Sequence, residues 1–128
     1  MSDEARRERG KQRMEQIAKV PAFDPPDAFT AMTVDHVFGE LWDRPGLSDR
    51  DRRLLSIAIL AARGMEAEAR VHVGGALQSS DLTTAEVMEV ILHVAHYAGW
   101  PHAAMLYRTF RERCGELGLE VPGPEEES

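Results

Sequence analysis

One stretch of the chain, residues 86–101 with the sequence EVMEVILHVAHYAGWP, constrains the fold most because it carries the signals of a single helix. Thr83 and Glu86 match the capping box that opens a helix, and the turn at 99–101 ends it. The helix is otherwise apolar, so its histidine and aromatic side chains need partners if they are buried. We expect them either to form a structural hydrogen-bond network or to line a pocket.

Similar signals divide the rest of the chain into helices. Pro25 and Pro26 separate the first two segments, and Pro45 with Gly46 forms the next turn. No segment shows the alternating apolar pattern of a strand. The sequence therefore predicts an all-α fold of about six helices with short connections. The predicted helices span residues 1–19, 27–42, 48–64, 66–78, 83–99 and 101–117.

Length and composition predict one globular domain with charged ends. The chain has 128 residues, of which 43% are hydrophobic, which is enough for one core without disulfides. We expect a charged N-terminal helix or arm at 1–24, a folded domain at 25–118 and a disordered acidic tail at 119–128.

Charge and residue usage exclude several classes of protein. The net charge of −7 argues against nucleic-acid binding, and no apolar run is long enough to cross a membrane. The N-terminus lacks the apolar core of a signal peptide. Cys114 is the single cysteine, so no internal disulfide, CxxC pair or cysteine-rich metal site can form. These features predict a cytoplasmic protein.

Glu68 and His72 form one candidate catalytic pair. They lie four residues apart on a predicted helix, so their side chains can meet on one face. A carboxylate beside an imidazole holds one tautomer and raises its pKa, which suits a general acid or base. The alternative is an ordinary surface ion pair.

The helix at 83–99 carries a second cluster, formed by His93, His96 and Tyr97 and followed by Trp100. Spacings of three and four allow a metal site, a structural network or a pocket wall. No HExxH pattern is present, and we expect no metal. For Trp100 alone, filling the core is the simpler expectation.

Arginines gather around the start of the helix predicted for 48–64, at Arg44, Arg50, Arg52 and Arg53. A forked guanidinium there would bind a substrate carboxylate well. The alternative is that most are solvated, which we expect for Arg50 and Arg52.

Three segments, taken together, resemble the carboxymuconolactone decarboxylase family. They are FGELWDRPGLSDRDRRLLSIAILAA (38–62), EAEARVHVGGAL (66–77) and EVMEVILHVAHYAGWPHAAMLYRTF (86–110), which occur in the family's order. The resemblance covers about residues 28 to 113. It implies the all-helical fold of the alkyl hydroperoxidase D-like superfamily, assembled as a homo-trimer or homo-hexamer.

The resemblance also implies an activity and roles for individual residues. The family's reaction is cofactor-free decarboxylation of 4-carboxymuconolactone to an enol-lactone in aromatic catabolism. By position, His72 would transfer a proton and Glu68 would orient it. Arg44 or Arg53 would hold a carboxylate, and His93 and Tyr97 would line the pocket. Their superfamily relatives with a redox CxxC motif are thiol peroxidases, a chemistry that this chain lacks the cysteines to perform.

Some residues depart from the family pattern and keep other functions open. His96 and Trp100 stand where the family usually has aliphatic residues, and the loop QSSDLT (78–83) is longer than usual. One alternative is a lyase or isomerase that acts on a different cyclic acid or oxygenated metabolite. Another is a non-enzymatic oligomer that binds a small ligand.

Overall fold

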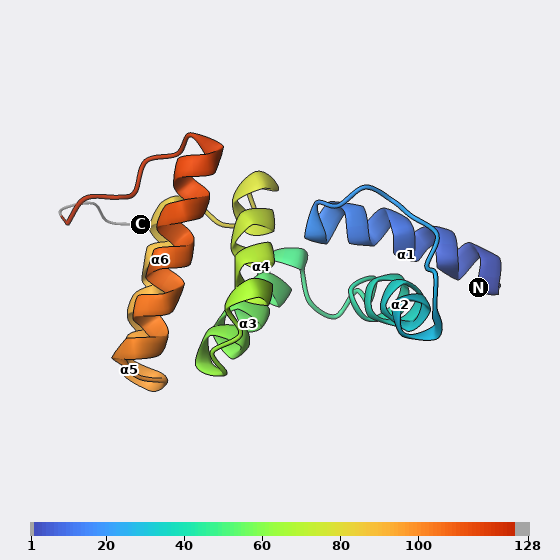
Figure 1. Cartoon of the computed structure of the whole chain (residues 1–128), viewed down its shortest axis with the longest axis horizontal. Helices are drawn as coiled ribbons and strands as arrows, with labels where there is room; N and C mark the ends of the chain where they lie inside the picture. The colour runs from blue at the N-terminus through green and yellow to red at the C-terminus, as the bar shows by residue number, and fades with distance from the viewer. Residues whose placement is uncertain (1, 125–128) are drawn as a thin grey trace. The chain divides into compact units, whose positions relative to one another are not determined.

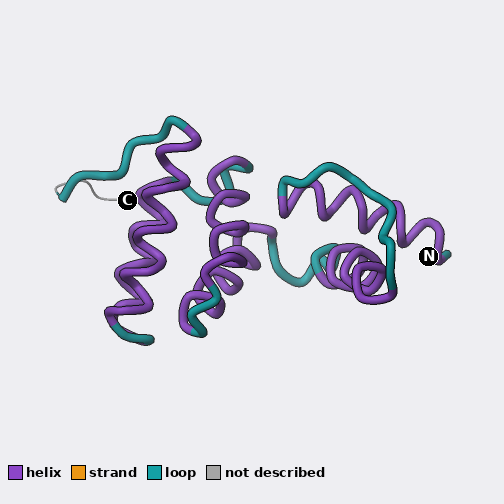
Figure 2. Tube along the Cα trace, in the orientation of Figure 1, coloured by secondary structure: helices purple, strands orange, loops and turns teal. Residues whose placement is uncertain are grey.

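The structure, a computed structural model, describes residues 2–124 of the chain. The chain divides into two compact units, of which the first ends at Asp49 and the second begins at Arg50. Residues 2–124 form helices joined by loops and contain no strand, as Figure 2 shows. The predicted all-α class is confirmed.

In the first unit, helix α1 (Asp3–Ala18) is followed by a short helix α2 (Ala28–Met32) and a π-helix η1 (Thr33–Leu41). Asp27 caps α2, because its side chain accepts a hydrogen bond from the backbone N–H of Thr30 at 2.8 Å. The prediction of one regular α-helix over 27–42 is wrong, since its second half is π-helical.

The π-helix aligns three buried side chains of the first unit. Val34, Phe38 and Trp42 lie four residues apart and are all buried. Positions four residues apart also lie near one face of an α-helix, which has about 3.6 residues per turn. Apolar spacing alone does not distinguish the two, which explains the wrong prediction. Phe29, in the short helix α2, is 83% exposed.

Helix α1 packs directly against η1. Its arginines pair with acidic residues there: Arg7 Nε lies 2.6 Å from Asp35 Oδ1, and Arg6 Nη1 lies 2.7 Å from Glu40 Oε1. The N-terminal segment is helical as predicted, but these ion pairs fix it to its neighbour rather than leaving it a solvated arm. The boundary expected after residue 24 lies inside this unit.

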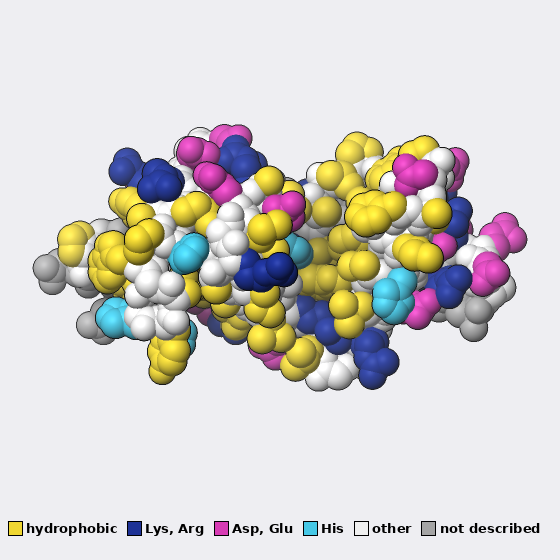
Figure 3. All heavy atoms as spheres, turned by 60° about the horizontal axis from the view of Figure 1, so that its bottom comes forward, with side chains coloured by type: hydrophobic (Ala, Val, Ile, Leu, Met, Phe, Trp, Pro, Cys, Tyr) yellow, Lys and Arg dark blue, Asp and Glu magenta, His cyan; other side chains and the backbone are white. Residues whose placement is uncertain are grey.

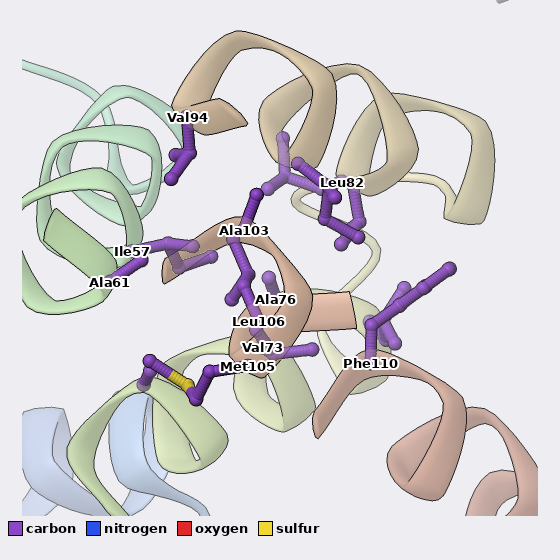
Figure 4. Close-up of a cluster of buried hydrophobic side chains, with 14 of the residues drawn as sticks. Ile57, Ala61, Val73, Ala76, Leu82, Val94, Ala103, Met105, Leu106 and Phe110 are labelled. Atoms are coloured by element: carbon purple, nitrogen blue, oxygen red, sulfur yellow. The ribbon is translucent and has the colours of Figure 1, made fainter. Parts of the chain in front are cut away.

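The second unit contains α3 (Asp49–Ala62), α4 (Glu66–Gln78), α5 (Thr84–Tyr97) and α6 (Trp100–Leu117). Helix α6 packs against both α4 and α5, which lie beside it in Figure 1. Side chains from all four helices meet in one core, shown in Figure 4. The labelled members are Ile57, Ala61, Val73, Ala76, Leu82, Val94, Ala103, Met105, Leu106 and Phe110.

The predicted helix ends of the second unit are confirmed. Thr83 and Glu86 form the reciprocal capping box at the start of α5. Pro101 lies in the first turn of α6, where a missing N–H costs little. Gly64 follows α3 with φ of 71°, a conformation that favours glycine. Of the expected tail, residues 119–124 are not helical, and 125–128 lie outside the described residues.

Within residues 2–124, every helix is too short or too polar to cross a membrane. Cys114 is buried in the core of the second unit. Burial there raises the pKa of the Cys114 thiol.

Candidate active site

The structure places His72 beside Arg53. His72 belongs to α4 and is half-buried, whereas Arg53 belongs to α3 and is 0% exposed. The Arg53 Nη1 atom lies 3.1 Å from Nδ1 of His72. Because a guanidinium can only donate hydrogen bonds, Nδ1 of His72 must be the acceptor. Two residues separated by 19 positions thus form a direct contact that the sequence pattern did not show.

Asp81 anchors the same guanidinium from the loop that joins α4 and α5. Its Oδ2 atom lies 3.3 Å from Nε of Arg53. The Asp81 carboxylate is largely buried, with 19% of the side chain exposed. A buried charge needs a partner of opposite sign, and Asp81 supplies one for Arg53. Sequence reasoning missed Asp81, since no spacing rule links a loop residue to a distant helix.

The surroundings of His72 favour the neutral imidazole. Burial lowers the pKa of His72 from 6.5 to about 4, and the nearby positive charge of Arg53 contributes in the same direction. A neutral ring that accepts at Nδ1 carries its proton on Nε2. At neutral pH, His72 is therefore a hydrogen-bond donor at Nε2 and not a cation.

The expected pairing of Glu68 with His72 is not what the structure shows. Glu68 is exposed on α4, and the partner at Nδ1 of His72 is Arg53. The expected rise in the pKa of His72 is also wrong, because burial and a cation lower it. Spacing of four makes a Glu–His contact possible on a helix, but a neighbouring helix supplies the stronger neighbour here.

A second feature of the same unit is a cavity of about 650 Å³ lined by residues from α3, α5 and the turn before α5. His93 lies in its wall. His72 is not among its lining residues. Arg50 and Glu86 form an ion pair at this cavity. The lining residues are Arg50, Leu54, Ala58, Thr83, Glu86, Glu89, Val90, His93 and Val94.

The histidine and aromatic residues at the end of α5 and the start of α6 form an exposed row rather than a buried network. His93 and Tyr97 stack with ring centroids 4.5 Å apart, and His96 meets Trp100 edge to face at 6.3 Å. Tyr97 is 82% exposed and Trp100 is 66% exposed, so the expectation that Trp100 fills the core is wrong. The buried face of α5 is instead formed by Val87, Ile91 and Val94. Figure 3 shows histidine side chains (cyan) next to hydrophobic side chains (yellow) on the surface of the molecule.

The remaining arginines differ in their surroundings. Arg44 is exposed in the turn that follows η1 and belongs to the first unit. Arg50 is exposed, as expected, and it also pairs with Glu86 in the cavity wall. Arg53 has an internal role, because its guanidinium is fully buried against His72 and Asp81. Its expected contact with a substrate carboxylate stays a prediction.

No group of three or more histidine, cysteine or acidic side chains within residues 2–124 is arranged to hold a metal ion. The chemistry that these residues can perform is hydrogen-bond donation from a neutral imidazole. Such a donor stabilises negative charge that develops on a substrate oxygen.

Comparison with known proteins defines the class. The sequence model of the carboxymuconolactone decarboxylase family matches residues 27–112, which is well over half of the chain. The chain therefore belongs to the carboxymuconolactone decarboxylase family. The recognised resemblance is confirmed.

Two characterised relatives are decarboxylases by name. The chain is 38% identical over 82 residues to the 4-carboxymuconolactone decarboxylase of Acinetobacter baylyi, an alignment that covers 64% of this chain and 60% of the relative. It is 31% identical over 70 residues to the nitrosuccinic acid decarboxylase of Metarhizium robertsii, covering 55% and 48% respectively. The chain thus spans only about half to three fifths of the length of these relatives.

Proposed function

We propose that the protein is a decarboxylase that acts on a γ-lactone carboxylic acid of the 4-carboxymuconolactone type. The observation that carries the proposal is the half-buried His72, held neutral beside the Arg53 guanidinium. Membership of the family and the names of the two relatives support it.

The reaction needs a place for two electrons and one proton. When the bond between the ring carbon and the carboxylate breaks, CO₂ leaves and the electron pair moves into the conjugated lactone carbonyl. The carbonyl oxygen becomes a dienolate oxygen, and a proton from water then adds to a ring carbon, which forms a new carbon–hydrogen bond and regenerates the carbonyl. The substrate's own carbonyl accepts the electrons, so no cofactor is needed. The protein's task is to stabilise that oxygen.

His72 is our candidate for this task. Its Nε2–H donates to the dienolate oxygen, and the bond strengthens as negative charge develops. A neutral donor suits the reaction because it is present throughout the neutral pH range. Tyr97 and His93 remain candidates for lining the substrate site, and Arg44 for binding a carboxylate.

Steady-state kinetics of a single variant test this role. His72→Asn keeps an oxygen that can accept from Arg53 but removes the imidazole donor. Loss of one such donor lowers kcat by about 10²- to 10³-fold. His36→Asn, at an exposed histidine of the first unit, should retain wild-type kcat. Equal rates for wild type and His72→Asn would refute the role of His72.

Nitrosuccinic acid is a second candidate substrate, suggested by the name of the second relative. Its chemistry is parallel, because loss of CO₂ beside a nitro group moves the electron pair onto nitro oxygens. The same donor could stabilise either anion. Parallel assays of both acids distinguish the candidates. Turnover of neither, with saturable binding of one, would favour a ligand-binding module.

We also propose that the protein assembles as a homo-trimer or homo-hexamer. Large apolar side chains stay exposed on the second unit, including Leu55, Ile59 and Trp100. Such surfaces are commonly buried between copies of a chain. Sedimentation velocity at micromolar concentration should show one species larger than a monomer. A monomer alone at that concentration would contradict the assembly.

A further inference from the structure

We propose that Arg53 is a positioning residue for His72. By donating a hydrogen bond to Nδ1 of His72, Arg53 fixes the imidazole as the Nε2–H tautomer. His72 is then a hydrogen-bond donor to substrate and not a general base. The catalytic consequence rests on the proposed function, but the tautomer itself does not. This assignment differs from the roles inferred from sequence, in which Arg53 binds a substrate carboxylate and His72 transfers a proton. Here Arg53 orients His72, and His72 donates a hydrogen bond to substrate.

The geometry of the Arg53 guanidinium supports this role. Its Nη1 lies 3.1 Å from Nδ1 of His72, while its Nε lies 3.3 Å from the Asp81 carboxylate. Arg53 is 0% exposed, so its side chain has little freedom to leave these contacts. A planar guanidinium offers donors in fixed directions, and holding one of them at Asp81 sets the direction of the other. Arg53 therefore aims a donor at Nδ1 of His72.

Other charged groups around His72 act in different ways. On its own helix, Glu68 is exposed to solvent. From α6, the Arg113 side chain crosses α4 at Gly74, where a side chain larger than hydrogen would overlap it. The Arg53 guanidinium, in contrast, contacts Nδ1 of His72 directly with a donor.

The tautomer has a mechanistic consequence. With Nδ1 occupied by a cationic donor, the ring cannot take up a second proton there without losing that hydrogen bond. Nε2 already carries a proton, so it cannot accept one from substrate. His72 can then donate a hydrogen bond to a developing oxyanion but cannot remove a proton. A neutral histidine polarises a substrate carbonyl in this way. The proton that reaches the substrate carbon must come from water or another acid.

Long-range ¹H–¹⁵N NMR of the uniformly ¹⁵N-labelled full chain tests the proposal without substrate. The His72 ring should show a protonated Nε2 and an unprotonated Nδ1 near neutral pH. At about pH 5.5, roughly 3% of the ring should be cationic with a pKa of about 4, against roughly 90% for an ordinary histidine. A proton on Nδ1, or a mainly cationic ring at that pH, overturns the proposal.

Substitution of Arg53 separates positioning from simple packing. Arg53→Met fills similar volume without a donor, so both neutral tautomers should appear and the titration midpoint should rise while staying below 6.5, since burial persists. Arg53→Lys keeps a cationic donor and should retain the Nε2–H tautomer. An unchanged tautomer in Arg53→Met overturns the proposal. If Arg53→Met does not fold, the wild-type spectrum alone decides.

The two proposals fail in distinguishable ways. An Nε2–H tautomer without CO₂ release from either candidate acid would leave the positioning role intact and remove the decarboxylase function. CO₂ release together with an Nδ1–H tautomer would support the decarboxylase function and remove the positioning role of Arg53. In an active enzyme, kcat/KM of wild type should not fall as the pH is lowered through 6.5. In Arg53→Met, kcat/KM should begin to fall at a higher pH than it does in wild type.

Discussion

The buried imidazole of His72 should make the protein sensitive to mild acid. In the folded chain its pKa is lowered to about 4, whereas in the unfolded chain it returns to about 6.5. Between these values, the unfolded state binds a proton that the folded state does not. The free energy of unfolding therefore falls as the pH falls through this window. His72→Asn removes the titrating group while keeping an acceptor for Arg53.

The size of the effect follows from the shift. One pKa unit corresponds to about 1.4 kcal/mol, so a change from 6.5 to about 4 is worth about 3 kcal/mol in total. By about pH 4.5, most of this has been lost, which gives about 2 to 3 kcal/mol relative to neutral pH. The penalty belongs to wild type alone. Whatever the stability of His72→Asn at neutral pH, wild type should lose that much more than the variant on acidification.

Urea unfolding followed by circular dichroism measures the difference. Wild type and His72→Asn are compared at about pH 7.5 and about pH 4.5, at one protein concentration because assembly shifts apparent stability. His96→Asn is the matched control, since this imidazole is exposed and stays in water. Its difference from wild type should be the same at both pH values. An equally constant difference for His72→Asn would refute the burial of a neutral His72.

Of three substitutions at glycines and a helix cap, two should lower the free energy of unfolding and one should raise it. Gly10→Ala in α1 should be strongly destabilising by thermal unfolding, because the new methyl group would overlap the backbone oxygen of Val34 in η1. Gly115→Ala in α6 meets open space and should stabilise by about 0.5 to 1 kcal/mol, as for an ordinary helical glycine. Thr83→Ala removes the cap of α5 and should lower the free energy of unfolding by about 1 kcal/mol. A higher melting temperature for Gly10→Ala would contradict the first prediction. An unchanged melting temperature for Gly115→Ala or Thr83→Ala would contradict the other two.

Much of the fold was predictable because local signals mark its helix ends. The capping box at Thr83 and the proline at 101 are properties of a few adjacent residues, and the structure confirms both. The π-helical turn over 33–41 was not predictable, since its buried positions also match an α-helical pattern. The docking of α1 was missed for a different reason: its partners are acidic residues nearly 30 or more positions away.

The candidate site was only partly predictable. His72 stood out as a histidine on a helix of small residues, but its strongest neighbour depends on how α3 and α4 pack. Helical spacing pointed to Glu68, whereas the structure brings Arg53 and Asp81 together. The stacking of His93 on Tyr97 followed from their spacing of four. Their exposure did not, because an apolar helix does not show from its sequence which side faces the core.

The central claim is tested most directly by measuring CO₂ together with the product in D₂O. The dialysed full chain is incubated with carboxyl-¹³C-labelled 4-carboxymuconolactone in the presence of EDTA and followed by ¹³C and ¹H NMR. The predicted result is one labelled CO₂ per lactone consumed, one deuterium in the enol-lactone, and a rate about 10²- to 10³-fold lower in His72→Asn. CO₂ release no faster than in a protein-free sample would contradict the claim.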